Sequence, residues 1–197
     1  MKKLLILFAV MLISIPVLSQ DRSKFLYAEF SDKSVSLYPS LKFFGNSFDP
    51  SVTVGGGIDY KQKGNFTSFQ TFQLTGFKTR FTGNGATLTS SFGYRYGLAS
   101  GFFGEVMAGL GSTAFFPSRE TFAQNEDGDY VQVNPLIVRA ALPLDIVIGY
   151  KSGNYAFYLQ YKYMLIAPYT DILFVPMLGV SQTGVGIRYT INHFVGE

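Results

Sequence analysis

Residues 87–98 read TLTSSFGYRYGL, and this stretch decides the fold class. Large apolar side chains and small or polar ones alternate along it, which predicts a β-strand, because successive side chains of a strand point to opposite faces. One predicted face is apolar and the other is small and polar. The apolar positions are Leu88, Phe92, Tyr94, Tyr96 and Leu98, and the opposite positions are Thr87, Thr89, Ser91, Gly93 and Arg95.

The same alternation recurs along the chain, with turn-forming residues between the segments. It predicts an all-β protein of eight strands. The segments are 34–44, 51–62, 67–80, 85–98, 102–117, 136–151, 154–167 and 182–191.

Four details of this pattern bear on the strand count and on regularity. Phe25–Phe30 extends the first strand or forms another, and Ile172–Val180 is apolar enough to be a strand, so ten strands is the alternative. Pro39 and Pro143 fall inside proposed strands, which predicts a bulge or a strand end near each, because proline lacks an N–H. The alternation also slips between Phe69 and Phe72, which predicts a further bulge.

The polar faces decide which side of the predicted barrel points inward. A face turned to bulk water is rich in charged residues, whereas these faces carry mostly Gly, Ser and Thr. The composition therefore predicts a transmembrane antiparallel up-and-down β-barrel with a small, polar lumen, and a soluble lipocalin-like barrel is the alternative. Tyrosines near the strand ends are typical of membrane interfaces; they are Tyr60, Tyr94, Tyr96, Tyr150, Tyr155 and Tyr189.

The N-terminus predicts secretion. Lys2 and Lys3 precede the apolar run Leu4–Val17, which is shorter than the ~20 residues of a membrane-spanning helix, so residues 1–19 are interpreted as a cleaved signal peptide. Residues 20–197 then form a single barrel domain in a bacterial outer membrane. Its 14 basic and 13 acidic residues give no electrostatic case for nucleic acid. The chain has no cysteine, which excludes disulfides and thiolate chemistry.

Connection lengths predict the orientation. Short turns at Lys61–Asn65, Ala99–Gly101 and Ser152–Gly153 are expected on the periplasmic side. The opposite side receives the connections that we expect to be longer, as is typical of outer-membrane barrels. They are Gly45–Pro50, Phe81–Asn84, Ser118–Pro135 and Pro168–Ser181.

The whole pattern resembles the OmpA/OmpX-type family of small outer-membrane barrels. In that family, an assembly signal in the last strand, polar-x-Gly-x-x-apolar-x-apolar, is read by the barrel-insertion machinery. The matching residues here are Gln182, Gly184, Ile187 and Tyr189. The family's strand usually stops at a terminal aromatic residue, whereas this chain continues through residues 192–197.

Charged residues on the predicted lumen faces form the main candidate site: Lys42, Asp59, Arg95, Glu105, Asp145, Lys162 and Arg188. Buried charges need partners, so we interpret them as a structural ion-pair network, with a narrow gated ion path as the alternative. Arg95 and Glu105 are expected to meet across a short turn, and closure of the barrel is expected to bring Arg188 near Lys42 and Lys162.

Two outer connections are candidate binding sites. Glu120, Glu126, Asp127 and Asp129 lack the spacing of a calcium loop, so we expect a solvated loop and no metal site. The apolar segment 168–180 extends the neighbouring strands, caps the barrel mouth or binds a protein partner. The single histidine, His193, lies beyond the last predicted strand, and no catalytic residues or cofactor are predicted.

Three functions follow as hypotheses. The favoured one is a noncatalytic outer-membrane barrel, in contact with outer-membrane lipid and lipopolysaccharide, that contributes to envelope integrity or to surface-loop interactions. The alternatives are a narrow channel or conduit for apolar solutes, and a lipid-modifying enzyme.

Overall fold

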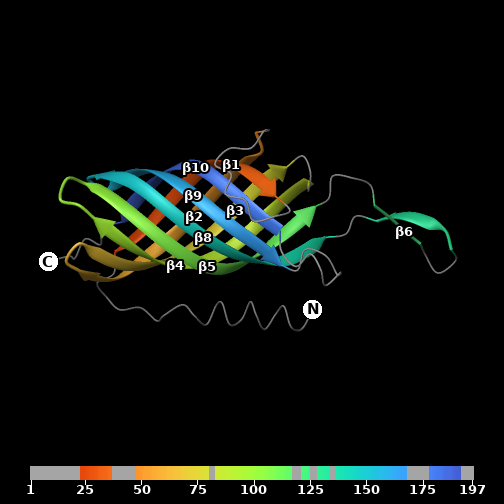
Figure 1. Ribbon diagram of the computed structural model, residues 1–197, viewed down its shortest axis with the longest axis horizontal. Helices are drawn as coiled ribbons and strands as arrows, with labels where there is room; N and C mark the ends of the chain where they lie inside the picture. Colours follow the sequence, from red (N-terminus) through yellow and green to blue (C-terminus); the bar gives the residue numbers. More distant parts are fainter. Residues whose placement is uncertain are drawn as a thin grey trace.

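The computed structural model describes residues 23–36, 48–79, 83–116, 121–124, 128–133, 136–167 and 178–191. Eight strands, each antiparallel to its neighbours, close into a barrel (Figure 1) in the order β1-β10-β9-β8-β5-β4-β3-β2. Their bounds are β1 Lys24–Ser36, β2 Pro50–Lys63, β3 Phe66–Thr79, β4 Gly83–Gly97, β5 Phe102–Phe116, β8 Ile137–Ser152, β9 Tyr155–Ala167 and β10 Leu178–Ile191. The predicted up-and-down barrel is therefore confirmed, with eight strands rather than ten.

Two further strands lie outside the barrel. β6 (Thr121–Gln124) and β7 (Tyr130–Val133) pair as a two-stranded sheet within the connection that was expected to be a plain loop. This small sheet projects beyond one end of the barrel (Figure 1). The described residues contain no helix long and apolar enough to cross a membrane.

The first strand differs from its prediction. β1 runs from Lys24 to Ser36, so Phe25–Phe30 belongs to it, and the predicted strand 34–44 is wrong at its start. Residues 37–47, with Pro39, lie outside the described residues. The inward face of β1 mixes Phe25 and Tyr27 with Glu29 and Lys33, so the sequence does not separate into one apolar and one polar face.

The predicted irregularities also fall elsewhere. β3 and β4 pair in continuous register past Phe69 and Phe72, and the bulge lies instead in β2, where the register shifts between Asp59 and Lys61. Pro143 neither ends β8 nor shifts its register with β9. The pairing of β8 with β5 is interrupted beside it, between Ala141 and Leu144, because proline offers no N–H to that ladder.

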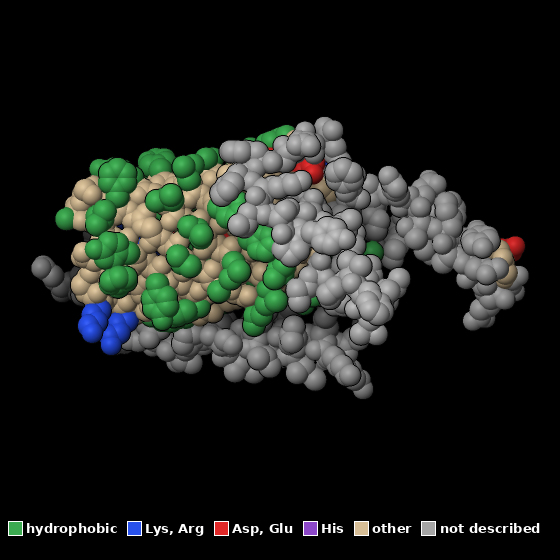
Figure 2. Space-filling view, in the orientation of Figure 1, with side chains coloured by type: hydrophobic (Ala, Val, Ile, Leu, Met, Phe, Trp, Pro, Cys, Tyr) green, Lys and Arg blue, Asp and Glu red, His purple; other side chains and the backbone are tan. Residues whose placement is uncertain are grey.

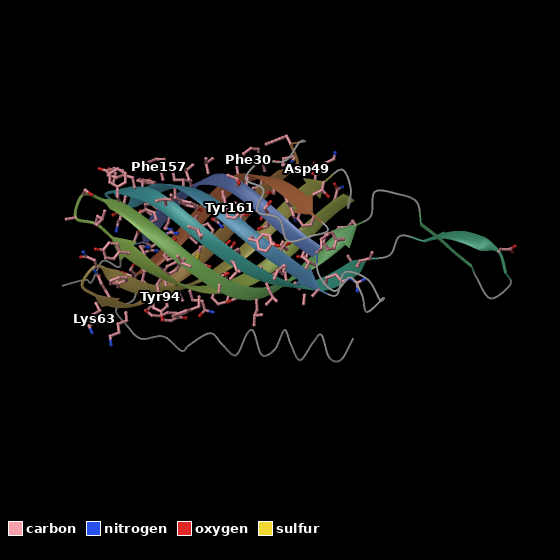
Figure 3. All side chains as sticks on the ribbon, in the orientation of Figure 1. Phe30, Asp49, Lys63, Tyr94, Phe157 and Tyr161 are labelled. Carbon is pink, nitrogen blue, oxygen red and sulfur yellow. The ribbon has the colours of Figure 1, made fainter. Side chains whose placement is uncertain are left out.

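The barrel wall has its apolar face outside. In β2, Val52 and Val54 are 53% and 50% exposed, whereas Thr53 between them is 0% exposed. On the face seen in Figure 2, apolar side chains are spread over the described part of the outer surface, and Lys and Arg side chains gather at one end. Phe30, Tyr94 and Phe157 project away from the wall (Figure 3). The predicted assignment of the two faces is therefore correct.

We name the two ends of the barrel by their connections. The short-turn end carries the tight turns at Gly64, Gly101 and Gly153, each of which has a positive φ that glycine adopts without strain. The long-loop end is the opposite one. Only residues 80–82 join β3 to β4 at that end. This connection is therefore as short as the turns at the other end, whereas we expected it to be longer.

Aromatic and apolar residues also fill much of the lumen, which the sequence pattern had suggested to be small and polar. One buried cluster lies toward the short-turn end and includes Phe25, Phe69, Phe103 and Tyr158. Another lies toward the long-loop end and comprises Phe77, Phe115, Ala141, Met164, Ile166, Leu178 and Val180. Glycines on neighbouring strands make room for these rings.

Candidate functional site: the charged lumen and its vestibule

Four charged residues form one connected layer in the lumen, near the short-turn end. Arg188 on β10 binds Glu105 on β5 with both terminal nitrogens, at 2.5 and 2.8 Å. Arg95 on β4 donates from Nε to the same carboxylate at 2.5 Å, and its Nη1 lies 3.2 Å from Asp59 on β2. We call these four residues the ion-pair layer.

Aromatic rings hold both guanidinium groups in place. The Cζ atom of Arg95 lies 4.8 Å from the ring centre of Phe69 and 5.3 Å from that of Phe25. Arg188 lies 4.5 Å from the same Phe25 ring. Cation–π attraction is strengthened where water is excluded, so the rings and the carboxylates together fix the two arginine side chains.

A cavity of about 570 Å³ opens at the short-turn end, above this layer. Arg95, Arg188 and Asp59 line its inner part, and the exposed residues Lys61 and Lys151 line its outer part. We call this cavity the vestibule. Asp59 and Arg95 each keep 18% of the side chain exposed, whereas Glu105 beneath them is fully buried.

A second polar layer lies farther along the lumen. Lys162 on β9 donates to Oε1 of Gln73 at 2.7 Å and lies 3.8 Å from Asp145 on β8. Gln160 donates to the same aspartate at 3.1 Å. All four side chains are buried, so each charge has a polar partner within the barrel, as a low-dielectric interior requires.

The structure divides the predicted lumen residues between these two layers. Asp59, Arg95, Glu105 and Arg188 share the first, and Asp145 and Lys162 share the second. The expected approach of Arg188 to Lys162 is wrong, because Lys162 pairs in register with Gln182, six residues before Arg188 on β10. Lys42 lies outside the described residues.

Sequence reasoning missed two buried charges on β1. Glu29 and Lys33 are 3% and 1% exposed. Neither carboxylate oxygen of Glu29 has a hydrogen-bond partner among the described residues, and Nζ of Lys33 lies 3.1 Å from the ring centre of Phe77. Both residues follow Phe25 and Tyr27 at even spacings, which places all of them on one face of the strand, but the misplaced first strand hid this signal.

The residues of the predicted assembly signal all lie on β10. Ile187 and Tyr189 point outward and are 41% exposed each, whereas Gln182 and Gly184 point inward. Gln182 donates to the hydroxyl of Ser51 on β2 at 2.7 Å.

Most of the two outer connections lies outside the described residues. Leu178–Val180, the end of the apolar segment 168–180, belongs to β10 and is buried, whereas residues 168–177 are not described. Glu120, Glu126 and Asp127 are not described either, and His193 also falls beyond the described part. Within the described ranges, no three acidic or histidine side chains gather to hold a metal ion.

Solved structures with the same architecture include barrels of the outer membrane. Neisserial surface protein A is 13% identical, with a TM-score of 0.53, over 86% of this chain and 97% of its own. The outer-membrane enzyme PagL is also 13% identical, with a TM-score of 0.54, over 85% of this chain and 99% of its own. No family model and no curated protein matches the sequence. The chain thus has the fold of the small eight-stranded outer-membrane barrels, as its resemblance to the OmpA/OmpX-type family suggested.

Proposed function

We propose that this protein is a noncatalytic outer-membrane β-barrel that contributes to envelope integrity or presents its long connections for surface interactions. One observation carries the proposal: along the middle of the strands the large side chains that face away from the lumen are apolar, and the charged side chains there face inward. Such a distribution is unfavourable in water and favourable in hydrocarbon, where a closed barrel also satisfies all its backbone hydrogen bonds.

Paired aromatic rings near the short-turn end support a membrane boundary there. Phe66 and Tyr96 lie 4.8 Å apart between ring centres, and Tyr155 and Tyr189 lie 5.1 Å apart. All are well exposed. Tyrosine suits this depth because its ring stays in hydrocarbon while its hydroxyl reaches water. Lys63 lies at the same end of the barrel (Figure 3) and pairs in register with Phe66.

The filled lumen supports a structural role for the buried charges. Beyond the ion-pair layer and the second polar layer, the apolar cluster around Phe77 and Phe115 occupies the long-loop end. Eight strands enclose a space that side chains fill. We therefore propose that the two charged layers hold opposite walls of the barrel together. A narrow channel remains the second candidate, favoured by the vestibule, which extends inward as far as Arg95 and Arg188.

The proposed partners follow from this location. They are outer-membrane lipid and lipopolysaccharide around the wall, the barrel-insertion machinery at the β10 signal, and a protein partner at segment 168–180. Residues 1–19 are proposed to be removed as a signal peptide. Deleting segment 168–177 is expected to abolish capture of that partner without unfolding the barrel.

Cell fractionation combined with semi-native electrophoresis tests the proposal. A folded barrel is expected to follow the outer membrane, to migrate faster before boiling than after it, and to have the mass of a chain that begins near residue 20. A soluble periplasmic protein with no mobility shift contradicts the membrane assignment. Altered lipid A or phospholipid on deletion of the gene would instead favour the enzyme hypothesis.

A further inference from the structure

The vestibule has the size and composition of a binding site. Its volume of about 570 Å³ lies within the range of small-molecule pockets, and most of the side chains that line it are polar or charged. Phe102 and Phe103 supply aromatic surface, and Gln62, Asn65 and Thr190 supply neutral polar groups.

Its charge is strongly one-sided. Four cationic residues line it, Lys61, Arg95, Lys151 and Arg188, against a single anionic one, Asp59. Glu105 does not line the cavity, and the surroundings keep a net charge of +2 when it is included. A concave wall of low dielectric concentrates such a field at the mouth of the cavity.

The inner wall is also rigid. Arg95 is held by Glu105, by Asp59 and by the ring of Phe69, so its exposed part keeps one position. The outer lysines are exposed and adjust to a ligand. The nitrogens of both arginines are bonded to Glu105 and Asp59 or are buried. The lysine ammonium groups would therefore contact an oxyanion directly, and the two guanidinium groups below them add a fixed positive field.

We propose that the vestibule binds a small solute that carries two or more carboxylate or phosphate groups. The site goes beyond the proposed structural role and does not depend on it, because a barrel that merely stabilises the envelope needs no ligand at this end. In the proposed orientation, the solute comes from the periplasm.

Glycine 97 provides a direct steric test. It lines the vestibule, and an added Cβ there would meet no atom within 4 Å. Gly97→Phe is therefore expected to fill the cavity without disturbing the wall. Gly76→Phe is the matched control, because Gly76 is equally unobstructed but lies on the exposed outer face of β3.

Lysine substitutions test the charge. Lys61→Gln and Lys151→Gln each remove one positive charge from the vestibule. Lys78→Gln removes the same charge from an exposed position near the other end of the barrel. Each vestibule substitution is expected to weaken anion binding about threefold to tenfold, and the control to leave it unchanged, since exposed charges are screened over about 10 Å.

The experiment is calorimetric titration of the full barrel, folded in neutral maltoside micelles, with citrate and separately with pyrophosphate. Wild type and Gly76→Phe are expected to bind one equivalent, more weakly in high salt, and Gly97→Phe to lose at least tenfold in affinity. If citrate binds more tightly, the site prefers carboxylate groups. If pyrophosphate binds more tightly, it prefers phosphate groups. Retained heat-modifiability shows that each variant is folded. No binding of either anion to wild type overturns the proposal, as does equal weakening by Lys78→Gln and Lys151→Gln.

Discussion

Arg188 and Glu105 form a two-point ion pair across the lumen, at 2.5 and 2.8 Å, although 83 residues separate them in the chain. Their strands, β10 and β5, are not neighbours in the barrel. The pair therefore ties opposite parts of the wall together, and Arg95 joins it through the same carboxylate.

Glu105→Gln is expected to destabilise the folded barrel by about 3–5 kcal/mol, because it removes the counter-charge that buried Arg188 shares with half-buried Arg95. Urea unfolding in lipid vesicles measures the change in free energy. Glu29→Gln is the matched control, since neither oxygen of Glu29 has a hydrogen-bond partner among the described residues, and it should cost far less. Equal losses for the two variants would show that the ion-pair layer has no special role in stability.

Gly186→Ala is expected to destabilise the barrel by about 1–3 kcal/mol through overpacking. The ring of Tyr158 lies where the new methyl group would go. Adding Tyr158→Leu should recover part of the loss, because it withdraws the ring. Gly76→Ala, which meets no neighbour within 4 Å, serves as the control in the same unfolding assay, and a loss there of similar size would contradict the packing argument.

Leu159→Arg tests whether the outer wall faces lipid. Leu159 lies near the middle of β9 and is 60% exposed, so an arginine there would be harmless in water. In a bilayer, the substitution is expected to cost about 2–4 kcal/mol. Leu98→Arg, just beyond the end of β4 and 50% exposed, should cost at most about 1 kcal/mol at the interface. If neither substitution changed the free energy of unfolding, the outer wall would face water rather than lipid.

Planar-bilayer recording separates the filled lumen from a channel. Purified wild-type protein is expected to show no sustained conductance, because the ion-pair layer and the apolar cluster at the long-loop end both occlude the lumen. Arg95→Ala should remain closed, since the apolar cluster is untouched. Steady wild-type conductance that changes with Arg95→Ala would instead establish the channel and refute the closed lumen.

Local sequence predicted β4 well because its two faces are chemically distinct. Residues 87–98 carry large apolar side chains outside and mostly small or polar ones inside, so periodicity alone assigned both the strand and its orientation. β1 was misplaced for the opposite reason. Its inward positions include Phe25 and Tyr27 beside Glu29, and aromatic residues on both faces weaken the alternation.

The candidate site was partly predictable. Arg95 and Glu105 pair in register across the turn between β4 and β5, and a short connection makes such a contact visible in the sequence. Their link to Arg188 was not visible, because it crosses the lumen between strands that are not adjacent. The hydrogen bond between Lys162 and Gln73 could not be predicted either, because 89 residues separate them in the chain.

The sequence by itself determined the all-β class, most of the strands and which face of each points outward, since these depend on a period of two along a single strand. The tertiary structure decided how the charges pair, where the lumen is filled and where the vestibule opens. Those properties depend on register, on barrel closure and on glycines such as Gly186 that admit a ring from another strand. They arise from distances between residues far apart in the chain, about which local periodicity carries no information.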